Sequence, residues 1–158
     1  MTPKGFLSEA EFLELIKTSV LPAIDLIVFN EKDQVLLGKR LNRPAQGFHF
    51  AAGGRIFKGE TYAQAFKRIV LKELGIILLP GQYVRIRKKY RHDYDDNMFR
   101  VEGIGTHYAP TLYIVYIESS VQIKNDAQHE NLRWWDIDEA LADETVHQYT
   151  KQYIIDAL

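Results

Sequence analysis

Residues 54–76 read GRIFKGETYAQAFKRIVLKELGI, and this segment is more informative about the fold than any other part of the chain. From Thr61 to Leu74 it contains no glycine or proline, and apolar residues recur at intervals of three and four. That spacing predicts an amphipathic helix over 61–74 with one apolar face. Gly75 follows directly and is placed to end the helix, because glycine readily adopts the left-handed conformation found at helix C-termini.

The segments on either side of this helix predict a mixed sheet covered by further helices. Ser8 and Glu11 form a capping box, which predicts a short amphipathic helix near the start of the chain. The other patterns predict strands at 23–29, 35–37, 48–52, 82–90, 106–117 and 133–135, and helices at 137–142 and 147–157. Within 106–117, Pro110 suggests an edge strand or a bulge. The predicted fold class is therefore α/β (α+β), with a mixed β-sheet sandwiched between α-helices.

The composition limits the classes of protein to consider. A chain of 158 residues that is 46% hydrophobic predicts one compact domain over 1–158. Twenty basic residues nearly balance 21 acidic ones, so neither nucleic acid nor a membrane surface is expected as a partner. The absence of cysteine excludes disulfides, thiolate zinc sites and cysteine nucleophiles. With no apolar leader or run of about 18 apolar residues, a cytoplasmic location is expected.

Spaced glycine and charged residues in 54–76 resemble the Nudix box, the sequence signature of Nudix hydrolases. The matching positions are Gly54, Glu60, Arg68, Glu73, Gly75 and Ile76. The box also has glutamates at two positions that are here Ile69 and Lys72. Residues 69, 72 and 73 lie within about one helical turn, where carboxylates can gather around hard cations that favour oxygen ligands. Only Glu73 remains, which indicates that the box has either decayed or been adapted to another reaction.

Further segments resemble one Nudix subgroup, the GDP-mannose mannosyl hydrolases, over roughly residues 20–150. The matching segments are Leu36 to Arg40, Asn42 to Gly47, Gly53 to Arg55, Tyr94 to Asn97, Thr106 to Tyr108, and Gln128 with His129. That subgroup also lacks two box carboxylates, although it usually has a proline where this chain has Ala52. The resemblance implies the Nudix fold and hydrolysis of a GDP-sugar, of the GDP-mannose or GDP-glucose type. Water would attack the anomeric carbon with inversion and release GDP and free sugar.

The resemblance also implies roles for individual residues. His129 would be the general base, and Glu73, the Gln128 side chain and the Gly53 carbonyl would bind one Mg²⁺ per subunit, with Mn²⁺ as an alternative. Arg40 and Arg55 would neutralise the leaving diphosphate, while Arg68 would orient Glu73 or contact a phosphate oxygen. The residues that would line the substrate pocket are Asp25, Arg40, Arg55, His92, Tyr94 and Tyr108. The subgroup further implies a homodimer.

Two other functions remain open from the sequence. A standard Nudix pyrophosphohydrolase would attack phosphorus and release GMP and sugar phosphate, but the missing carboxylates argue against it. A catalytically silent domain would only bind a nucleotide or regulate a partner, and the retention of Glu73, Gln128 and His129 argues against that function. Individual residues also have structural alternatives: Asp25 could be a satisfied buried acid, and Arg40 a surface cation that covers apolar neighbours.

Overall fold

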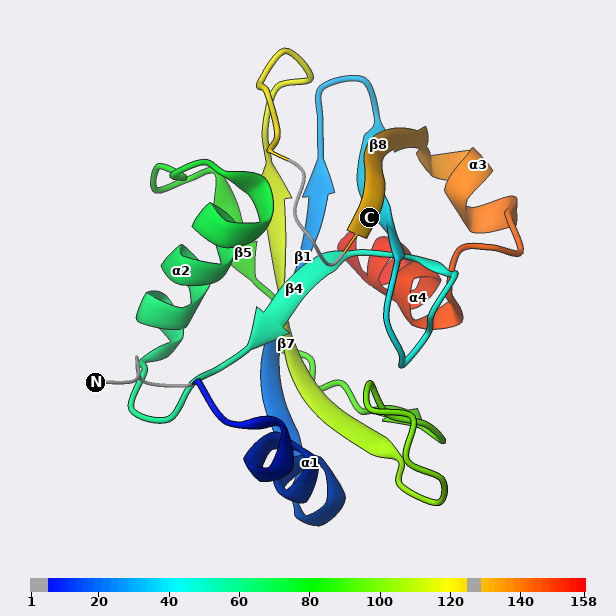
Figure 1. The fold of residues 1–158 in the computed structure, drawn as a ribbon. Coiled ribbons are helices and arrows are strands. Elements are labelled where there is room, and N and C mark those ends of the chain that lie inside the picture. Colours follow the sequence, from blue (N-terminus) through cyan, green and yellow to red (C-terminus); the bar gives the residue numbers. More distant parts are fainter. Residues whose placement is uncertain (1–5, 125–128) are drawn as a thin grey trace.

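The centre of the protein is one eight-stranded mixed sheet (Figure 1). The structure is a computed structural model that describes residues 6–124 and 129–158, with the backbone alone for 129–131. In chain order the elements are α1 (Glu9–Thr18), β1 (Leu21–Phe29), β2 (Gln34–Arg40), β3 (His49–Phe50), β4 (Ala52–Arg55), α2 (Tyr62–Leu74), β5 (Tyr83–Arg85), β6 (His92–Tyr94), β7 (Thr106–Tyr116), β8 (His129–Asp136), α3 (Ile137–Ala142) and α4 (Gln148–Ala157).

The strands are arranged in the order β3-β2-β1-β7-β5, with β4 paired to β1, β6 to β7 and β8 to β2. Strands β1 and β7 run parallel along their length, whereas the other pairs are antiparallel. The predicted hairpin between the first two strands is confirmed, since Phe29 of β1 lies opposite Val35 of β2. Strand β1 therefore lies in the middle of the sheet and contributes to both faces.

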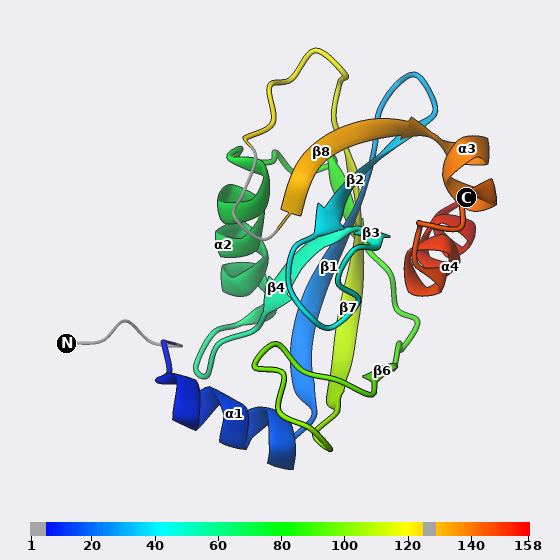
Figure 2. The same ribbon diagram turned by 45° about the vertical axis from the view of Figure 1, so that its right-hand side comes forward.

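Helices cover both faces of the sheet, as predicted: α2 lies on one side and α4 on the other (Figure 2). The side chains of a strand alternate between the two faces of a sheet. Accordingly, Ile24, Leu26 and Val28 of β1 pack with α2, while Ile27 and Phe29 belong to a second core that includes residues of α3 and α4. The chain thus has two apolar cores separated by the sheet.

The start of α1 and both ends of α2 follow from their capping residues. At the start of α1, the Ser8 side chain accepts a hydrogen bond from the Glu11 backbone N–H, and the Glu11 carboxylate accepts one from the Ser8 backbone N–H. Thr61 and Gln64 form the same box at the start of α2, which ends at Gly75 with φ 70° in the left-handed region. The helix predicted from residues 61–74 is confirmed, because local capping and apolar spacing agree there.

One strand prediction is wrong in extent, and a second is wrong about the position of the strand in the sheet. The segment 82–90 was expected to be one long strand, but only Tyr83–Arg85 forms β5, and His92–Tyr94 forms the separate strand β6. Strand β7 is central and not an edge strand. Its Pro110 lies between the residues that pair with β6 and those that pair with β5, where the missing N–H of proline breaks no pairing with either strand.

The strand predicted at 48–52 is also different. It divides into β3 (His49–Phe50) and β4 (Ala52–Arg55), so that Gly53 and Gly54 lie inside a strand and not after it. The strand predicted at 133–135 extends over His129–Asp136, with its N-terminal half paired to the end of β2.

Candidate active site

A cavity of about 440 Å³ lies beside β1 and β4, between α2 and the segment that contains β6. Side chains from both sheet strands and helices line it. The predicted site residues that line this cavity are Asp25, Arg40, Gly53, Arg55, Arg68, Glu73, His92, Tyr94 and Tyr108. The structure therefore brings together residues that are far apart in the sequence.

For two predicted site residues, Gln128 and His129, the structure does not describe the side chain. Gln128 lies outside the described residues. The backbone of His129 begins β8 and pairs with Arg40, whereas its side chain lies outside the described part of the chain. Because Arg40 lines the cavity, the register of β8 carries His129 to the edge of the sheet beside it.

The box helix presents one carboxylate to this cavity. Glu73, in the last turn of α2, is 1% exposed and lines the cavity. Ile69, one turn earlier, is equally buried, and its side chain packs 3.2 Å from the position that a Cβ on Gly54 would take. Lys72 also lines the cavity but is exposed and cationic. Thus the two substituted box positions hold a core residue and a positive charge.

Gly53 allows β4 to approach the acidic residue of β1. Gly53 lies opposite Asp25 in the antiparallel register. A Cβ added to Gly53 would collide with Asp25 Oδ1 and would lie 2.6 Å from the carbonyl oxygen of Ile24. Only glycine fits there, because every other residue carries the Cβ. The close approach keeps the Gly53 backbone and the Asp25 carboxylate at one place in the cavity wall.

Asp25 is held in a partly buried polar contact. It is preceded and followed by apolar residues of β1, and the Tyr153 hydroxyl of α4 donates to Asp25 Oδ2 at 2.5 Å. Burial raises the pKa of Asp25 to about 6, although the Tyr153 hydrogen bond and the charge of Arg40 act in the opposite direction. The carboxyl group is supported by α4, which packs on the face of the sheet toward which Asp25 points.

Two arginines supply positive charge to the cavity. Arg40 Nε donates to the Pro44 carbonyl at 2.9 Å, and its guanidinium lies 5.9 Å from the centre of the Phe50 ring. The Arg55 guanidinium lies 5.2 Å from the Phe12 ring centre, and desolvation by burial lowers its pKa. Guanidinium groups suit phosphate oxygens because they can donate two parallel hydrogen bonds.

Arg68 clamps the loop between β4 and α2. Its Nε donates to Glu60 Oε2 at 2.8 Å, and its Nη2 donates to Glu60 Oε1 at 2.9 Å and to the Arg55 carbonyl at 2.8 Å. The guanidinium also lies 3.6 Å from the centre of the Phe57 ring. Glu60 in turn accepts from the Phe57 backbone at 2.7 Å. The box residues Glu60 and Arg68 therefore fix the backbone that carries Arg55.

Aromatic rings form the wall near β6. The β6–β7 register places His92 opposite Tyr108, and the Tyr94 and Tyr108 rings are 6.4 Å apart. The His92 ring stacks on Tyr149 of α4 at 3.9 Å, and burial lowers the pKa of His92 to about 4, so that it is neutral at pH 7. Tyr149 and Tyr153 were not among the residues predicted from the sequence. The only sequence signal was their spacing of four on the last helix, which puts both on one face.

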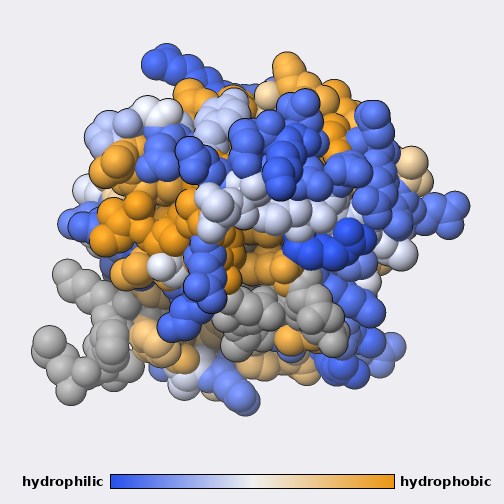
Figure 3. Space-filling model, turned by 90° about the horizontal axis from the view of Figure 1, so that it is seen from above, coloured by the Kyte–Doolittle hydropathy of each residue, from blue (hydrophilic) through white to orange (hydrophobic). Residues whose placement is uncertain are grey.

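A second hollow of about 500 Å³ lies between α2 and the segment before β5. Its lining is mainly apolar and includes Phe66, Val70 and Tyr113, with Lys67 as its charged member among the described residues. Seen from above, apolar side chains gather on this left-hand side of the molecule (Figure 3). This hollow lacks the paired charges of the first cavity, so the chemistry is assigned to the first.

Comparison with known proteins identifies the family. Residues 20–156 match the NUDIX domain. The chain belongs to the Nudix family. It is 32% identical over 157 residues to the low-salt glycan biosynthesis protein Agl8 of Haloferax volcanii. That alignment covers 99% of this chain and 93% of the Haloferax protein. A Nudix hydrolase of Listeria monocytogenes is 36% identical over 86 residues, or 51% of this chain and 50% of that protein.

Solved Nudix structures share the fold. The MutT Nudix hydrolase of Burkholderia pseudomallei has a TM-score of 0.69 at 19% identity, covering 89% of this chain and 99% of that chain. The Nudix domain of Shewanella oneidensis NrtR, solved with ADP ribose, has a TM-score of 0.68 at 19% identity, covering 96% and 97% of the two chains. Both confirm the predicted mixed sheet with flanking helices.

Family membership supports hydrolase activity, and Nudix hydrolases generally use divalent metal ions such as Mg²⁺. Among the described residues, no group of three or more histidine, aspartate or glutamate side chains is placed to hold a metal ion.

None of the helices in the described part of the chain has the length and hydropathy needed to cross a membrane.

Proposed function

We propose that this protein hydrolyses a GDP-sugar, of the GDP-mannose or GDP-glucose type, to GDP and free sugar. Water attacks the anomeric carbon, and the configuration inverts. The observation that carries the proposal is the box helix, where Ile69 is buried in the core, Lys72 is cationic and Glu73 alone offers a carboxylate. Attack on phosphorus with several metals calls for a larger carboxylate cluster, whereas displacement at carbon requires a base and a stabilised leaving group.

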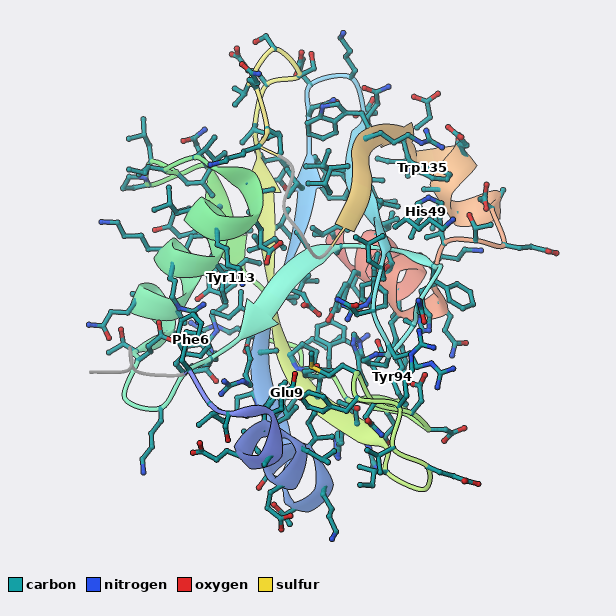
Figure 4. All side chains as sticks on the ribbon, in the orientation of Figure 1. Phe6, Glu9, His49, Tyr94, Tyr113 and Trp135 are labelled. Carbon is teal, nitrogen blue, oxygen red and sulfur yellow. The ribbon has the colours of Figure 1, made fainter. Side chains whose placement is uncertain are left out.

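The cavity has three chemical regions that suit the three parts of a nucleoside diphosphate sugar. The apolar region is formed by Phe6, Leu7, Phe12 and Met98 and would hold the base. Arg55 lies against Phe12 and, with Arg40, would bind the diphosphate. The hydrogen-bonding region, formed by Asp25, His92, Tyr94 and Tyr108, would hold the sugar. In the view of Figure 4, Phe6 lies on the side of α2 and Tyr94 lies on the other side of β1 and β7.

The residues present suit one hard cation. The buried Glu73 carboxylate and the Gly53 backbone border the same cavity, and both provide oxygen atoms, which Mg²⁺ prefers. We propose that they hold Mg²⁺, with Mn²⁺ as an alternative, together with Gln128, which lies outside the described residues. When bound, the ion supplies positive charge that neutralises the diphosphate. No carboxylate beyond Glu73 is required of the box helix for this role.

The protein side chains account for the remaining steps. His129 takes a proton from water as the water oxygen forms a bond to the anomeric carbon. The bond between that carbon and the diphosphate oxygen breaks, and its electron pair leaves with GDP. Arg40 and Arg55 stabilise the charge that develops on the diphosphate. Arg68 contributes indirectly, because its hydrogen bond to the Arg55 carbonyl fixes the backbone at that position.

One relative also supports a sugar-related substrate. The Haloferax volcanii protein is named for glycan biosynthesis, and the alignment with it covers nearly the whole of both chains. Glycan assembly consumes activated sugars, so a nucleotide sugar is a consistent substrate class.

We further propose that the protein is a cytoplasmic homodimer of single-domain subunits. Sedimentation velocity would measure the mass of the particle in solution and so test the dimer.

The decisive experiment is turnover of GDP-mannose and GDP-glucose in ¹⁸O-water with Mg²⁺. Attack at carbon places the label in the released sugar and leaves GDP unlabelled. Label in a phosphate group, together with GMP as product, would establish a pyrophosphohydrolase instead. Binding without turnover over a panel of nucleotide sugars would favour a binding module. In the first case, His129→Gln should lower kcat by about 10² to 10⁴, the usual contribution of a general base.

A further inference from the structure

Helix α4 packs directly against the part of the cavity wall that contains Asp25 and His92. Tyr149 and Tyr153 are four residues apart, so they project from the same face of the helix. His147 caps the helix by accepting from the Tyr149 backbone N–H at 3.1 Å. The cap fixes the first turn, and the two tyrosines then contact two different residues of the cavity wall.

Tyr153 contacts Asp25. The Tyr153 side chain is fully buried, and its hydroxyl donates to Asp25 Oδ2 at 2.5 Å. The other carboxylate oxygen, Oδ1, lies toward Gly53 in the cavity wall. Arg40 of β2, Tyr94 of β6 and Tyr108 of β7 line the same cavity as Asp25. Because Tyr153 engages one oxygen, it sets the direction in which the carboxylate presents the other.

Tyr149 contacts His92 and the backbone of β6. Its ring stacks on His92 at 3.9 Å with an interplanar angle of 1°. Its hydroxyl donates to the Asp93 carbonyl at 3.1 Å and lies 3.1 Å from the Asp93 backbone nitrogen, from which it accepts. Ring and hydroxyl together hold both the side chain of His92 and the strand that carries it.

We propose that Tyr153 and Tyr149 are positioning residues that set the orientations of Asp25 and His92 toward the sugar. The identity of the ligand rests on the proposed function, whereas the positioning itself does not. Neither tyrosine is assigned contact with substrate. Loss of Tyr153 should therefore impair recognition of the sugar and leave recognition of the nucleotide intact.

The first test is Tyr153→Phe, which removes one hydroxyl and keeps the ring. Loss of a hydrogen bond to a charged group should reduce kcat/KM for the GDP-sugar by about 10-fold to 100-fold, while the Kd for GDP measured by calorimetry stays unchanged. The matched control is Tyr90→Phe. Tyr90 packs edge-on against Tyr153 at 4.9 Å and donates to Asp156 at 2.7 Å, so it loses an equivalent hydroxyl away from Asp25.

A pair of variants tests Tyr149. Tyr149→Phe keeps the stacked ring and loses only the hydroxyl bonds to the β6 backbone, so it should lose less kcat/KM than Tyr149→Leu, which loses both ring and hydroxyl. Recovery with the conservative variant separates positioning of His92 from simple filling of space. Equal loss in both variants would overturn the role assigned to the ring.

A crystal structure of Tyr153→Phe decides the central point without any activity. The expected result is a changed or disordered Asp25 side chain in a protein whose fold and melting temperature match the Tyr90→Phe control. An Asp25 carboxylate in the wild-type orientation overturns the proposal. If the wild-type protein hydrolyses no GDP-sugar, the proposed function fails, and this comparison still tests the positioning role. If it does hydrolyse one and Tyr153→Phe is fully active, the positioning role alone fails.

Discussion

The clamp between Arg68 and Glu60 should be among the strongest charge pairs of the fold. Arg68 donates to both carboxylate oxygens, at 2.8 and 2.9 Å, and the two side chains are only 29% and 16% exposed. Hydrogen bonds to charged groups contribute about 1.5 to 3 kcal/mol each, and desolvation offsets part of this. A double-mutant cycle with Arg68→Met and Glu60→Gln should therefore give a coupling energy of about 2 to 3 kcal/mol at pH 7.

The assay is urea unfolding of the four proteins in the cycle, repeated across pH. Hydrogen bonds from Arg68 lower the pKa of Glu60, so the pair stabilises the fold above the unfolded pKa of about 4.3. That contribution should disappear as pH falls through the lower, folded value. The control cycle is Arg91 with Asp93, a 2.6 Å pair that is 73% and 49% exposed and should couple by less than about 1 kcal/mol. Equal coupling in both cycles would refute the reasoning from burial.

The other predictions concern the box helix and the cavity wall. Ile69→Glu should destabilise the protein by several kcal/mol, seen in thermal unfolding, because it places a carboxylate in the core beside Gly54; a stable variant that attacks phosphorus would contradict this. Glu73→Gln should keep the fold by circular dichroism and lose most cation-dependent turnover; near wild-type rates would rule out Glu73 as the cation ligand. Gly53→Ala should lower both the melting temperature and activity, because its Cβ would collide with Asp25, and an unchanged protein would exclude the close approach.

The box helix could be predicted from the sequence because its determinants are local. Thr61 and Gln64 make the N-terminal cap, and Gly75 makes the C-terminal one. Strand 82–90 could not be predicted correctly, because its alternating pattern extends past Arg85 while its pairing with β7 does not. Strand length depends on the partner strand, and periodicity in one segment carries no information about that partner.

The same holds for the site: residues close together in the sequence could be predicted, whereas contacts between residues far apart in the sequence could not. Glu73 and Arg68 were found through fixed spacing on one helix, and the cavity unites them with Asp25 and Tyr108. The support from Tyr153 was missed, because it acts on Asp25 across 128 residues of sequence. Nothing in the pattern of either segment indicates that a hydroxyl of the last helix meets the one acid in a buried strand.

The side chains of β1 point alternately into the two cores, and this arrangement has a consequence for engineering. These side chains separate the helix that bears Glu73 from the helix that bears Tyr153, since α2 and α4 pack on opposite faces of the sheet. Substitutions on the two helices share few neighbours, so their effects on stability should be close to additive. A library that varies α4 could alter sugar preference without repacking α2, and the two helices could be optimised in parallel and then combined.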